Sequence, residues 1–529
     1  MSDITSEIKK RRTFAIISHP DAGKTTLTEK FLLYGGAINL AGSVKGKKTA
    51  KHAVSDWMEI EKERGISVTS SVLQFNYDGY CINILDTPGH EDFSEDTYRT
   101  LMAADSAVMV IDASKGVEKQ TIKLFKVCVM RHIPIFTFIN KMDREANDPF
   151  ELLDEIENVL GIATCPINWP IGCGKAFKGV YDRKQKEVSL FKAAMNGQKE
   201  VDTKNISIDD DELKAEIGDD YWAKLEEDVE LLDGASAEFD MDLVSRGELS
   251  PVFFGSALTN FGVETFLKHF LSMTTSPLPR NSDKGLIDPF GSDFSAFVFK
   301  IQANMNKNHR DRIAFMRICS GKFEAGMEVK HIQGGKAIRL SQPQQLMAQE
   351  RKIIEEAYAG DIIGVFDPGI FSIGDTLTTA KDNFEFEGIP TFAPEHFARV
   401  RQVDTMKRKQ FVKGVMQIAQ EGAIQIFQEY QGGMEEIIVG VVGVLQFDVL
   451  KYRLENEYNV EIRLEKLPYE HIRWIENKDI DMDKLTGTSD MKKIRDLKGN
   501  PLLLFVNAWS VGMTLDRNDG LVLSEFGKN

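Results

Sequence analysis

The chain has 529 residues, which exceeds what one hydrophobic core organises, so three or four domains are expected. Hydrophobic residues make up 42% and charged residues 28%, as in ordinary globular proteins, and no apolar run is long enough to span a bilayer. The formal net charge of −16 excludes a protein that coats nucleic acid non-specifically, although local basic patches can still dock on a ribonucleoprotein.

The first part of the chain alternates short apolar runs with helical patterns. Residues 13–17 are predicted to form a strand, and a glycine-containing turn then leads into a helix from about Lys24 to Tyr34. Further strands are expected at residues 80–85, 107–111 and 133–139, with a helix over residues 117–132. This alternation indicates βαβ units and a mainly parallel sheet, hence an α/β fold.

A phosphate-binding loop is predicted between the first strand and the first helix. Its sequence fits the known template except that Ser18 stands where the first glycine usually does. Backbone N–H groups would hold the phosphates, Lys24 would reach the β and γ oxygens, and the Thr25 hydroxyl would bind magnesium. The alternative is a chance Gly-Lys-Thr at a helix start. The expected nucleotide-binding residues here are Ser18, His19, Pro20, Asp21, Ala22, Gly23, Lys24, Thr25 and Thr26.

A second motif, Asp-Thr-Pro-Gly-His, directly follows the apolar run at residues 80–85. Asp86 would lie at the carboxyl end of a strand, where open α/β sheets bind ligands, and could hold magnesium through water. Gly89 leaves room for a terminal phosphate and His90 can orient a water molecule. The alternative is an ordinary Asp–Pro–Gly turn. The candidate residues are Asp86, Thr87, Pro88, Gly89 and His90, with His90 and Lys24 as the catalytic pair.

The segment Arg64-Gly65-Ile66-Ser67 lies between these two motifs. In a GTPase, a hydroxyl from this segment binds magnesium only while the γ-phosphate is present. Ser67 can serve, although threonine is commoner, and the alternative is a surface hydroxyl. The predicted magnesium ligands are therefore Thr25, Ser67 and Asp86.

A base-recognition loop is predicted at the end of the strand over residues 133–139. The Asp143 carboxylate can accept two hydrogens from guanine, a donor pair that adenine lacks, which favours GTP over ATP. Asn140 would tie this loop to the phosphate loop. The further base-pocket residues are Lys141, Ser256 and Ala257.

The long gap between the two base-pocket segments implies an insertion at about residues 160–245. It includes the acidic segment 200–233, which is expected to be a solvent-facing helical insert or a docking surface for a basic partner.

The remaining chain predicts two further domains. A linker is expected at about residues 276–291, followed by short strands with glycine turns that suggest a small β-barrel. Beyond a boundary near residues 388–394, helices at 406–421 and 445–458 mix with strands in an α+β pattern. The expected domains are residues 1–280, 281–390 and 391–529.

Five scattered cysteines match no common zinc or redox spacing and are expected to be free thiols. Candidate basic docking patches are Lys9 to Arg12, the cluster Lys45, Lys47, Lys48 and Lys51, and Lys407 to Lys409, although each could simply be a solvated face. The N-terminus has no apolar signal core, so a cytoplasmic protein without membrane contact is expected.

In their order along the chain, the motifs at residues 18–25, 64–67, 86–90, 140–143 and 255–257 resemble those of the translational GTPases. Segments at 57–67, 89–97, 297–304, 360–362 and 443–448 extend the resemblance over the whole chain, toward the bacterial release-factor branch of that family. The resemblance implies a GTPase domain, a translation-factor β-barrel and a ferredoxin-like domain.

The implied function is ribosome-stimulated GTP hydrolysis in translation termination, which removes the stop-codon-reading release factor after peptide release. The implied cofactors are GTP or GDP and Mg²⁺. The implied partners are the factor-binding site of the large ribosomal subunit and class I release factors, with the protein itself a monomer. No arginine can be assigned as an internal finger, so the ribosome is expected to activate the site through His90.

Three alternatives remain at this point. One is another ribosomal GTPase role, such as translocation, ribosome rescue or ribosome protection, although translocases continue with further domains that are not expected here. A second is a scaffold that binds GTP without turnover, which the presence of both Ser67 and His90 disfavours. A third is an ATP-using kinase, which Asp143 disfavours.

Overall fold

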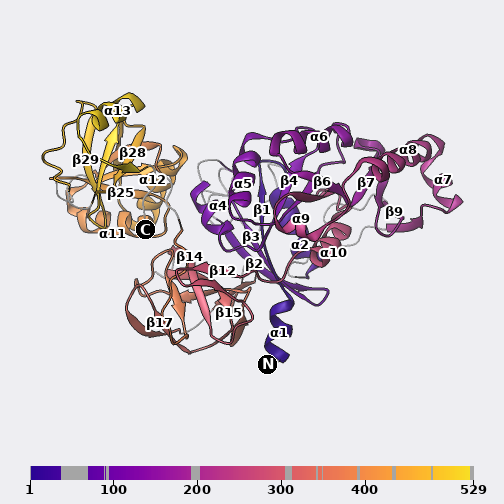
Figure 1. The fold of residues 1–529 in the computed structure, drawn as a ribbon, viewed down its shortest axis with the longest axis horizontal. Helices are drawn as coiled ribbons and strands as arrows, with labels where there is room; N and C mark the ends of the chain where they lie inside the picture. Colours follow the sequence, from indigo (N-terminus) through magenta and orange to yellow (C-terminus); the bar gives the residue numbers. More distant parts are fainter. Residues whose placement is uncertain are drawn as a thin grey trace.

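The structure is a computed structural model that describes residues 2–36, 70–88, 90, 94–191, 203–303, 312–340, 344–347, 350–389, 393–431, 437–477 and 480–524. We call residues 2–279 the N-terminal region, residues 293–379 the barrel and residues 395–524 the C-terminal region. Figure 1 shows these three bodies, coloured from indigo to yellow along the chain, with the barrel next to the N-terminal region. Within the described ranges, no helix combines the length and apolar character needed to cross a membrane.

The N-terminal region is built on a seven-stranded sheet of order β2-β3-β1-β4-β5-β11-β6. Only β2 is antiparallel to its neighbour, which confirms the predicted mainly parallel sheet. The strands are β1 (Arg11–Ser18), β2 (Ser71–Tyr77), β3 (Tyr80–Asp86), β4 (Ser106–Asp112), β5 (Ile135–Asn140), β6 (Ala163–Pro166) and β11 (Leu249–Phe254). The helices around it are α2 (Lys24–Tyr34), α4 (Ser94–Leu101), α5 (Lys119–Met130), α6 (Pro149–Leu160) and α10 (Val263–Met273). Helix α1 (Ser2–Lys9) instead contacts the barrel, and its Ile8 is buried in the barrel core.

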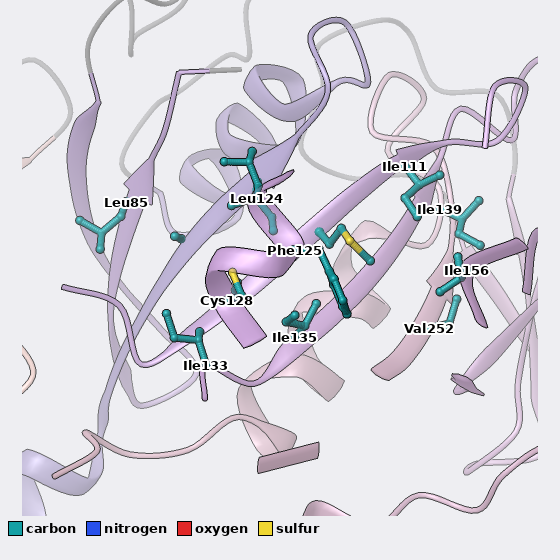
Figure 2. Packing of buried hydrophobic residues seen from close by; sticks show 14 of the residues in the cluster. Leu85, Ile111, Leu124, Phe125, Cys128, Ile133, Ile135, Ile139, Ile156 and Val252 are labelled. Atoms are coloured by element: carbon teal, nitrogen blue, oxygen red, sulfur yellow. The ribbon is translucent and has the colours of Figure 1, made fainter. Parts of the chain in front are cut away.

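The core lies between this sheet and its helices. Every residue of β4 is buried, as expected for a strand covered on both faces. From α5, Leu124, Phe125 and Cys128 lie in one buried cluster with the sheet residues Ile111 and Ile135 (Figure 2). The packing of apolar helix faces on both sides of the sheet fixes the carboxyl ends of the strands, where the predicted motifs lie.

The insertion before β11 forms a small body of its own at the far right of Figure 1. Its strands β7 (Asn168–Ile171), β8 (Gly179–Asp182), β9 (Glu187–Phe191) and β10 (Thr203–Ser207) make a four-stranded sheet. The acidic segment contributes β10 and the helices α7 (Asp211–Ile217) and α8 (Asp219–Ala235), before α9 (Met241–Ser245) returns the chain to β11. Asp182 anchors the insertion to α10, since its Oδ2 lies 2.5 Å from Nε2 of the buried His269.

The barrel confirms the second predicted fold. Its main sheet has the order β18-β17-β23-β14-β15-β22-β19-β20, and β16 pairs with β21 beside it. The strands are β14 (Ser295–Ala303), β15 (Arg312–Ser320), β16 (Lys322–Glu324), β17 (Glu328–His331), β18 (Lys336–Arg339), β19 (Gln344–Met347), β20 (Glu350–Ile353), β21 (Glu356–Tyr358), β22 (Ile362–Phe366) and β23 (Thr376–Thr378). The predicted linker before it contains a short hairpin, β12 (Arg280–Ser282) and β13 (Gly285–Ile287).

The C-terminal region begins with the unit β24-α11-β25-β26-α12-β27. Its strands lie in the order β27-β24-β26-β25, with β26 antiparallel to both β24 and β25, which is a ferredoxin-like arrangement. These elements are β24 (His396–Gln402), α11 (Arg408–Gln420), β25 (Gln425–Glu429), β26 (Ile437–Val441), α12 (Leu445–Tyr458) and β27 (Ile462–Leu467).

The last part of the chain, whose pattern predicted little, extends the β25 edge of this sheet. It supplies β28 (His471–Ile475), β29 (Met491–Asp496), β30 (Pro501–Phe505) and β31 (Leu523–Ser524), with α13 (Ala508–Asp516) beside them.

The basic patch predicted at Lys9 to Arg12 is wrong for its two arginines. Strand β1 begins at Arg11, two residues before the predicted start, and both arginines are buried. The Arg11 Nε atom lies 3.1 Å from Oδ2 of Asp361 in the barrel. Arg12 donates to the backbone oxygens of Lys9 and Leu271 at 2.7 and 3.2 Å. The two arginines therefore make their hydrogen bonds and ion pairs within the fold and do not form an exposed patch.

Candidate functional site

The loop between β1 and α2 has the backbone shape of a phosphate cradle. Asp21 and Gly23 adopt φ angles of 66° and 100°, and the Ser18 hydroxyl donates to the backbone oxygen of His19 at 2.9 Å. A Cβ atom on Gly23 would lie 2.2 Å from Nδ2 of Asn140, so only glycine fits there. Helix α2 begins at Lys24, so the N–H groups of its first turn face the loop, where an anion can bind.

Lys24 of the phosphate loop contacts Asp86 of the Asp-Thr-Pro-Gly-His motif. Both side chains are buried, and Nζ of Lys24 pairs with Oδ1 of Asp86. Asp86 ends β3 and is in register with Ile16 of β1, while the Thr87 hydroxyl donates to the Ile16 oxygen at 2.7 Å. A cation and a carboxylate thus lie at the loop expected to bind phosphate.

Asn140 joins the phosphate loop to the base loop, which confirms that part of the sequence prediction. Its Nδ2 donates to the Ala22 oxygen at 2.8 Å, and its Oδ1 accepts from the Ala257 N–H at 2.8 Å. The Asp143 carboxylate accepts from the Ser256 hydroxyl at 2.6 Å. The segments 140–143 and 255–257 therefore form one edge, although 112 positions separate Asp143 from Gly255 (255 − 143).

Asp112 is a residue of this edge that the sequence analysis missed. It ends β4, lies 2.6 Å from Nζ of Lys141, and accepts from the Ser114 N–H and hydroxyl at 3.0 and 2.7 Å. Burial raises the pKa of Asp112, but the bonds from Lys141 and Ser114 outweigh it and hold that pKa below its usual value. The available signal was its place at the end of an apolar strand, as for Asp86.

The other predicted residues are placed as follows. Thr25 and Thr26 lie half-buried in the first turn of α2, and His90 is also half-buried. His19 lies with Nε2 at 3.3 Å from Oε1 of Glu118. Ser67, Gly89 and the lysine cluster at 45–51 lie outside the described residues.

The donors at the phosphate end fit a magnesium ion better than a protein-only metal cage. Among the residues that the structure describes, no three His, Cys, Asp or Glu side chains are grouped to hold a metal. The Thr25 hydroxyl and the Asp86 carboxylate are oxygen donors, and Mg²⁺ is commonly held by one or two such groups together with phosphate oxygens. All five cysteines are free, as predicted.

Three family matches cover most of the chain. Residues 9–276 match the elongation factor Tu GTP binding domain, and residues 293–380 match elongation factor G domain 2. Residues 386–515 match the C-terminal domain of the class II release factor RF3. The three matches follow the same order as the three bodies of the fold.

Curated relatives match over nearly the whole length. A peptide chain release factor 3 of Symbiobacterium thermophilum is 60% identical, with 99% of this chain and 98% of the relative covered. One of Streptococcus mutans is 53% identical, with 99% of each chain covered. Among solved structures, a Thermus thermophilus protein superposes with a TM-score of 0.69 at 21% identity, covering 92% of this chain and 72% of that one, which supports the fold.

Proposed function

This chain belongs to the peptide chain release factor 3 family of translational GTPases, and on that premise we propose that it promotes departure of the class I release factor from the ribosome. As a member of this family, the chain is a GTP-hydrolysing factor of translation termination that binds GTP and GDP and interacts with the ribosome. The proposed step follows peptide release and returns the stop-codon-reading factor to the free pool.

The observation that carries this proposal is the C-terminal match at residues 386–515. It distinguishes this chain from factors that share only the GTPase domain and the barrel. The same match disfavours translocation or ribosome protection as the main task. A domain division at residues 1–280, 281–390 and 391–529 agrees with this assignment and stays a prediction.

For nucleotide binding, we assign the phosphates to residues 18–26 and the guanine base to Asn140, Lys141, Asp143, Ser256 and Ala257. Support comes from Asn140, which contacts both the phosphate loop and Ala257. Asp143 has acceptor capacity beyond its bond from Ser256, because a carboxylate offers about four lone-pair sites. An adenine at this position would leave that charge unpaired.

For hydrolysis, His90 orients the water that attacks the γ-phosphorus in line, and the bond to the β–γ bridging oxygen breaks to leave GDP and phosphate. Lys24 exchanges its Asp86 partner for phosphate oxygens and stabilises the negative charge that develops on them. Because no arginine of this chain is assigned to that charge, the large ribosomal subunit acts on His90 to start turnover.

Magnesium, when bound with the nucleotide, would be held by Thr25, Ser67 and Asp86 and would neutralise phosphate charge. The fit rests on the oxygen donors of Thr25 and Asp86 and on the pairing of Asp86 with Lys24 at the phosphate loop. We also propose that the protein acts as a monomer in the cytoplasm, where translation takes place.

The test uses a ribosome stopped at a stop codon with a fluorescent class I release factor bound. The departure of the label is timed with this protein plus GTP, GDP or a non-hydrolysable GTP analogue. We expect faster departure with GTP than without the protein. The same rate with and without it would overturn the proposed task while leaving the GTPase assignment intact.

A further inference from the structure

One barrel lysine enters the N-terminal region beside the phosphate end of the site. Lys300 lies in β14 and is only 6% exposed. Its Nζ donates to the backbone oxygen of Ser70, donates to the Ser70 hydroxyl at 2.9 Å, and lies 3.6 Å from Oδ2 of Asp96. Burying an ammonium group costs free energy, and this cost is offset only where an opposite charge and hydrogen-bond acceptors surround it.

Ser70 and Asp96 are themselves joined. The Ser70 N–H and hydroxyl each lie 2.6 Å from Oδ2 of Asp96, and the Thr100 hydroxyl donates to the Ser70 hydroxyl at 2.8 Å. Burial raises the pKa of Asp96, but the Lys300 charge, the Ser70 bonds and Arg99 outweigh it and keep that pKa below its usual value. Asp96 is therefore a charged partner for Lys300 at neutral pH.

The two residues that Lys300 contacts flank the Asp86–Pro88 segment. Ser71, the next residue after Ser70, is the cross-strand partner of Asp86 in the β2–β3 pair. Thr97, the next residue after Asp96, donates its hydroxyl to the Pro88 oxygen at 3.1 Å. A shift of Ser70 or Asp96 therefore displaces the segment that carries Asp86.

We propose that Lys300 is a positioning residue for the nucleotide site, through which the barrel supports binding of the triphosphate. It touches no reacting atom, and acts by holding Ser70 and Asp96 so that Asp86 and Pro88 keep their places. The inference rests on the role proposed above for the Asp86–His90 segment. It predicts that the barrel contributes to the affinity for the triphosphate relative to the diphosphate.

The test measures the affinities of the full chain for a fluorescent non-hydrolysable GTP analogue and for fluorescent GDP, with magnesium in excess. For Lys300→Met, we expect the ratio of the two dissociation constants to move against the GTP analogue by about fivefold or more. Lys300→Arg keeps the positive charge and should recover at least part of the ratio. Should Lys300→Met fail to fold, Asp96→Asn tests the same contact and should move the ratio the same way.

The matched control is Arg317→Met, which also removes a buried barrel cation. Arg317 pairs with Asp105, just before β4 and thus at the opposite end of the sheet from Asp86. Both variants should lower thermal stability, but only Lys300→Met should change the affinity ratio. An unchanged ratio in Lys300→Met, or an equal change in Arg317→Met, would overturn the inference.

A Lys24→Ala arm separates this inference from the proposed site. If Lys24→Ala loses GTP affinity while the affinity ratio of Lys300→Met stays unchanged, only the positioning role of Lys300 is excluded. Normal GTP affinity in Lys24→Ala contradicts the proposed phosphate site itself, and with it the basis of the inference.

Discussion

The N-terminal region contacts the barrel and the C-terminal region in different ways. Toward the barrel it presents buried ion pairs, Arg11 with Asp361 at 3.1 Å and Asp105 with Arg317, and the Thr13 hydroxyl donates to the Gly360 oxygen at 2.6 Å. Toward the C-terminal region, Arg99 of α4 donates to the backbone oxygens of Glu421 and Gly422 at 3.2 and 2.7 Å.

The contact with the C-terminal region is the easier of the two to break. Removing one member of a buried ion pair leaves an uncompensated charge, whereas a carbonyl released to the surface regains water. Arg99 also keeps a second partner within α4, since its Nη2 lies 2.8 Å from Glu95. We expect the barrel to move with the N-terminal region as one body, while the C-terminal region can detach from α4.

A change at His90, which belongs to neither contact, should have the strongest consequence. For His90→Ala, we expect normal GTP binding and a fall of about 10²–10⁴-fold in ribosome-stimulated hydrolysis, because the attacking water is no longer oriented. Turnover of radiolabelled GTP with and without ribosomes measures this. If ribosomes stimulate hydrolysis by the variant as strongly as by the wild type, His90 does not orient the attacking water.

The barrel interface should respond strongly to loss of one charge. Arg11→Met leaves the Asp361 carboxylate, 2% exposed as a residue, without its cation, and should cost about 3 kcal/mol of unfolding free energy. Denaturant unfolding followed by fluorescence measures it. The neighbouring Lys10→Met, whose side chain is exposed, should stay within about 0.5 kcal/mol of wild type. Equal losses of unfolding free energy in Arg11→Met and Lys10→Met would show that the buried ion pair does not hold the barrel interface.

The C-terminal contact should break with a smaller loss. Gly422 has φ 77°, and a Cβ atom there would lie 1.7 Å from Nη1 of Arg99, so Gly422→Ala must displace that arginine. We expect a stability loss of about 1–3 kcal/mol from backbone strain, with a longer distance between fluorescent labels on the barrel and the C-terminal region.

The control for that variant lies in the same region. Gly499 has φ 87° but open space around its Cβ position, so Gly499→Ala introduces similar strain without touching Arg99. Its label distance should match wild type. If both variants lengthen the distance, strain rather than the Arg99 contact holds the C-terminal region in place.

A weaker effect is expected for the pH dependence of the stability that the Lys300–Asp96 contact contributes. Since the folded-state pKa of Asp96 is lowered, its contribution to stability is full above its unfolded value of about 3.9 and is lost as pH falls through the folded value. The stability difference between wild type and Lys300→Met should therefore narrow in acid. Thermal unfolding of both between neutral pH and pH about 3 measures this, and a constant difference would show that Asp96 is not the charged partner.

Much of the N-terminal fold followed from local pattern. The helix from Lys24 to Tyr34 has the predicted ends, because a glycine turn and a strand precede it, and the strands over 80–86 and 106–112 are within a residue of expectation. The contact of Asn140 with Ala22 was also predictable, because Asn140 and the loop that carries Ala22 follow parallel strands of one sheet at the same edge.

What pattern could not reveal are the contacts between distant parts. Arg11 and Arg12 read as a surface patch because their partners, Asp361 and the Leu271 oxygen, lie hundreds of positions away. Two strands after residue 470, β28 and β29, were missed because polar and charged residues interrupt their apolar pattern. Lys300 gave no signal of its own, since only the fold brings it to Ser70.

The pairing of Arg11 with Asp361 also bears on how the chain is made. The two residues are 350 positions apart, so the ribosome completes the N-terminal region, where Arg11 pairs with Glu7, long before it adds the second carboxylate. Domains generally fold as units during synthesis, starting from the N-terminus. During that interval the barrel that buries Arg11 and the start of β1 has not yet been synthesised. The buried contact with Asp361 therefore forms only after the barrel has emerged from the ribosome.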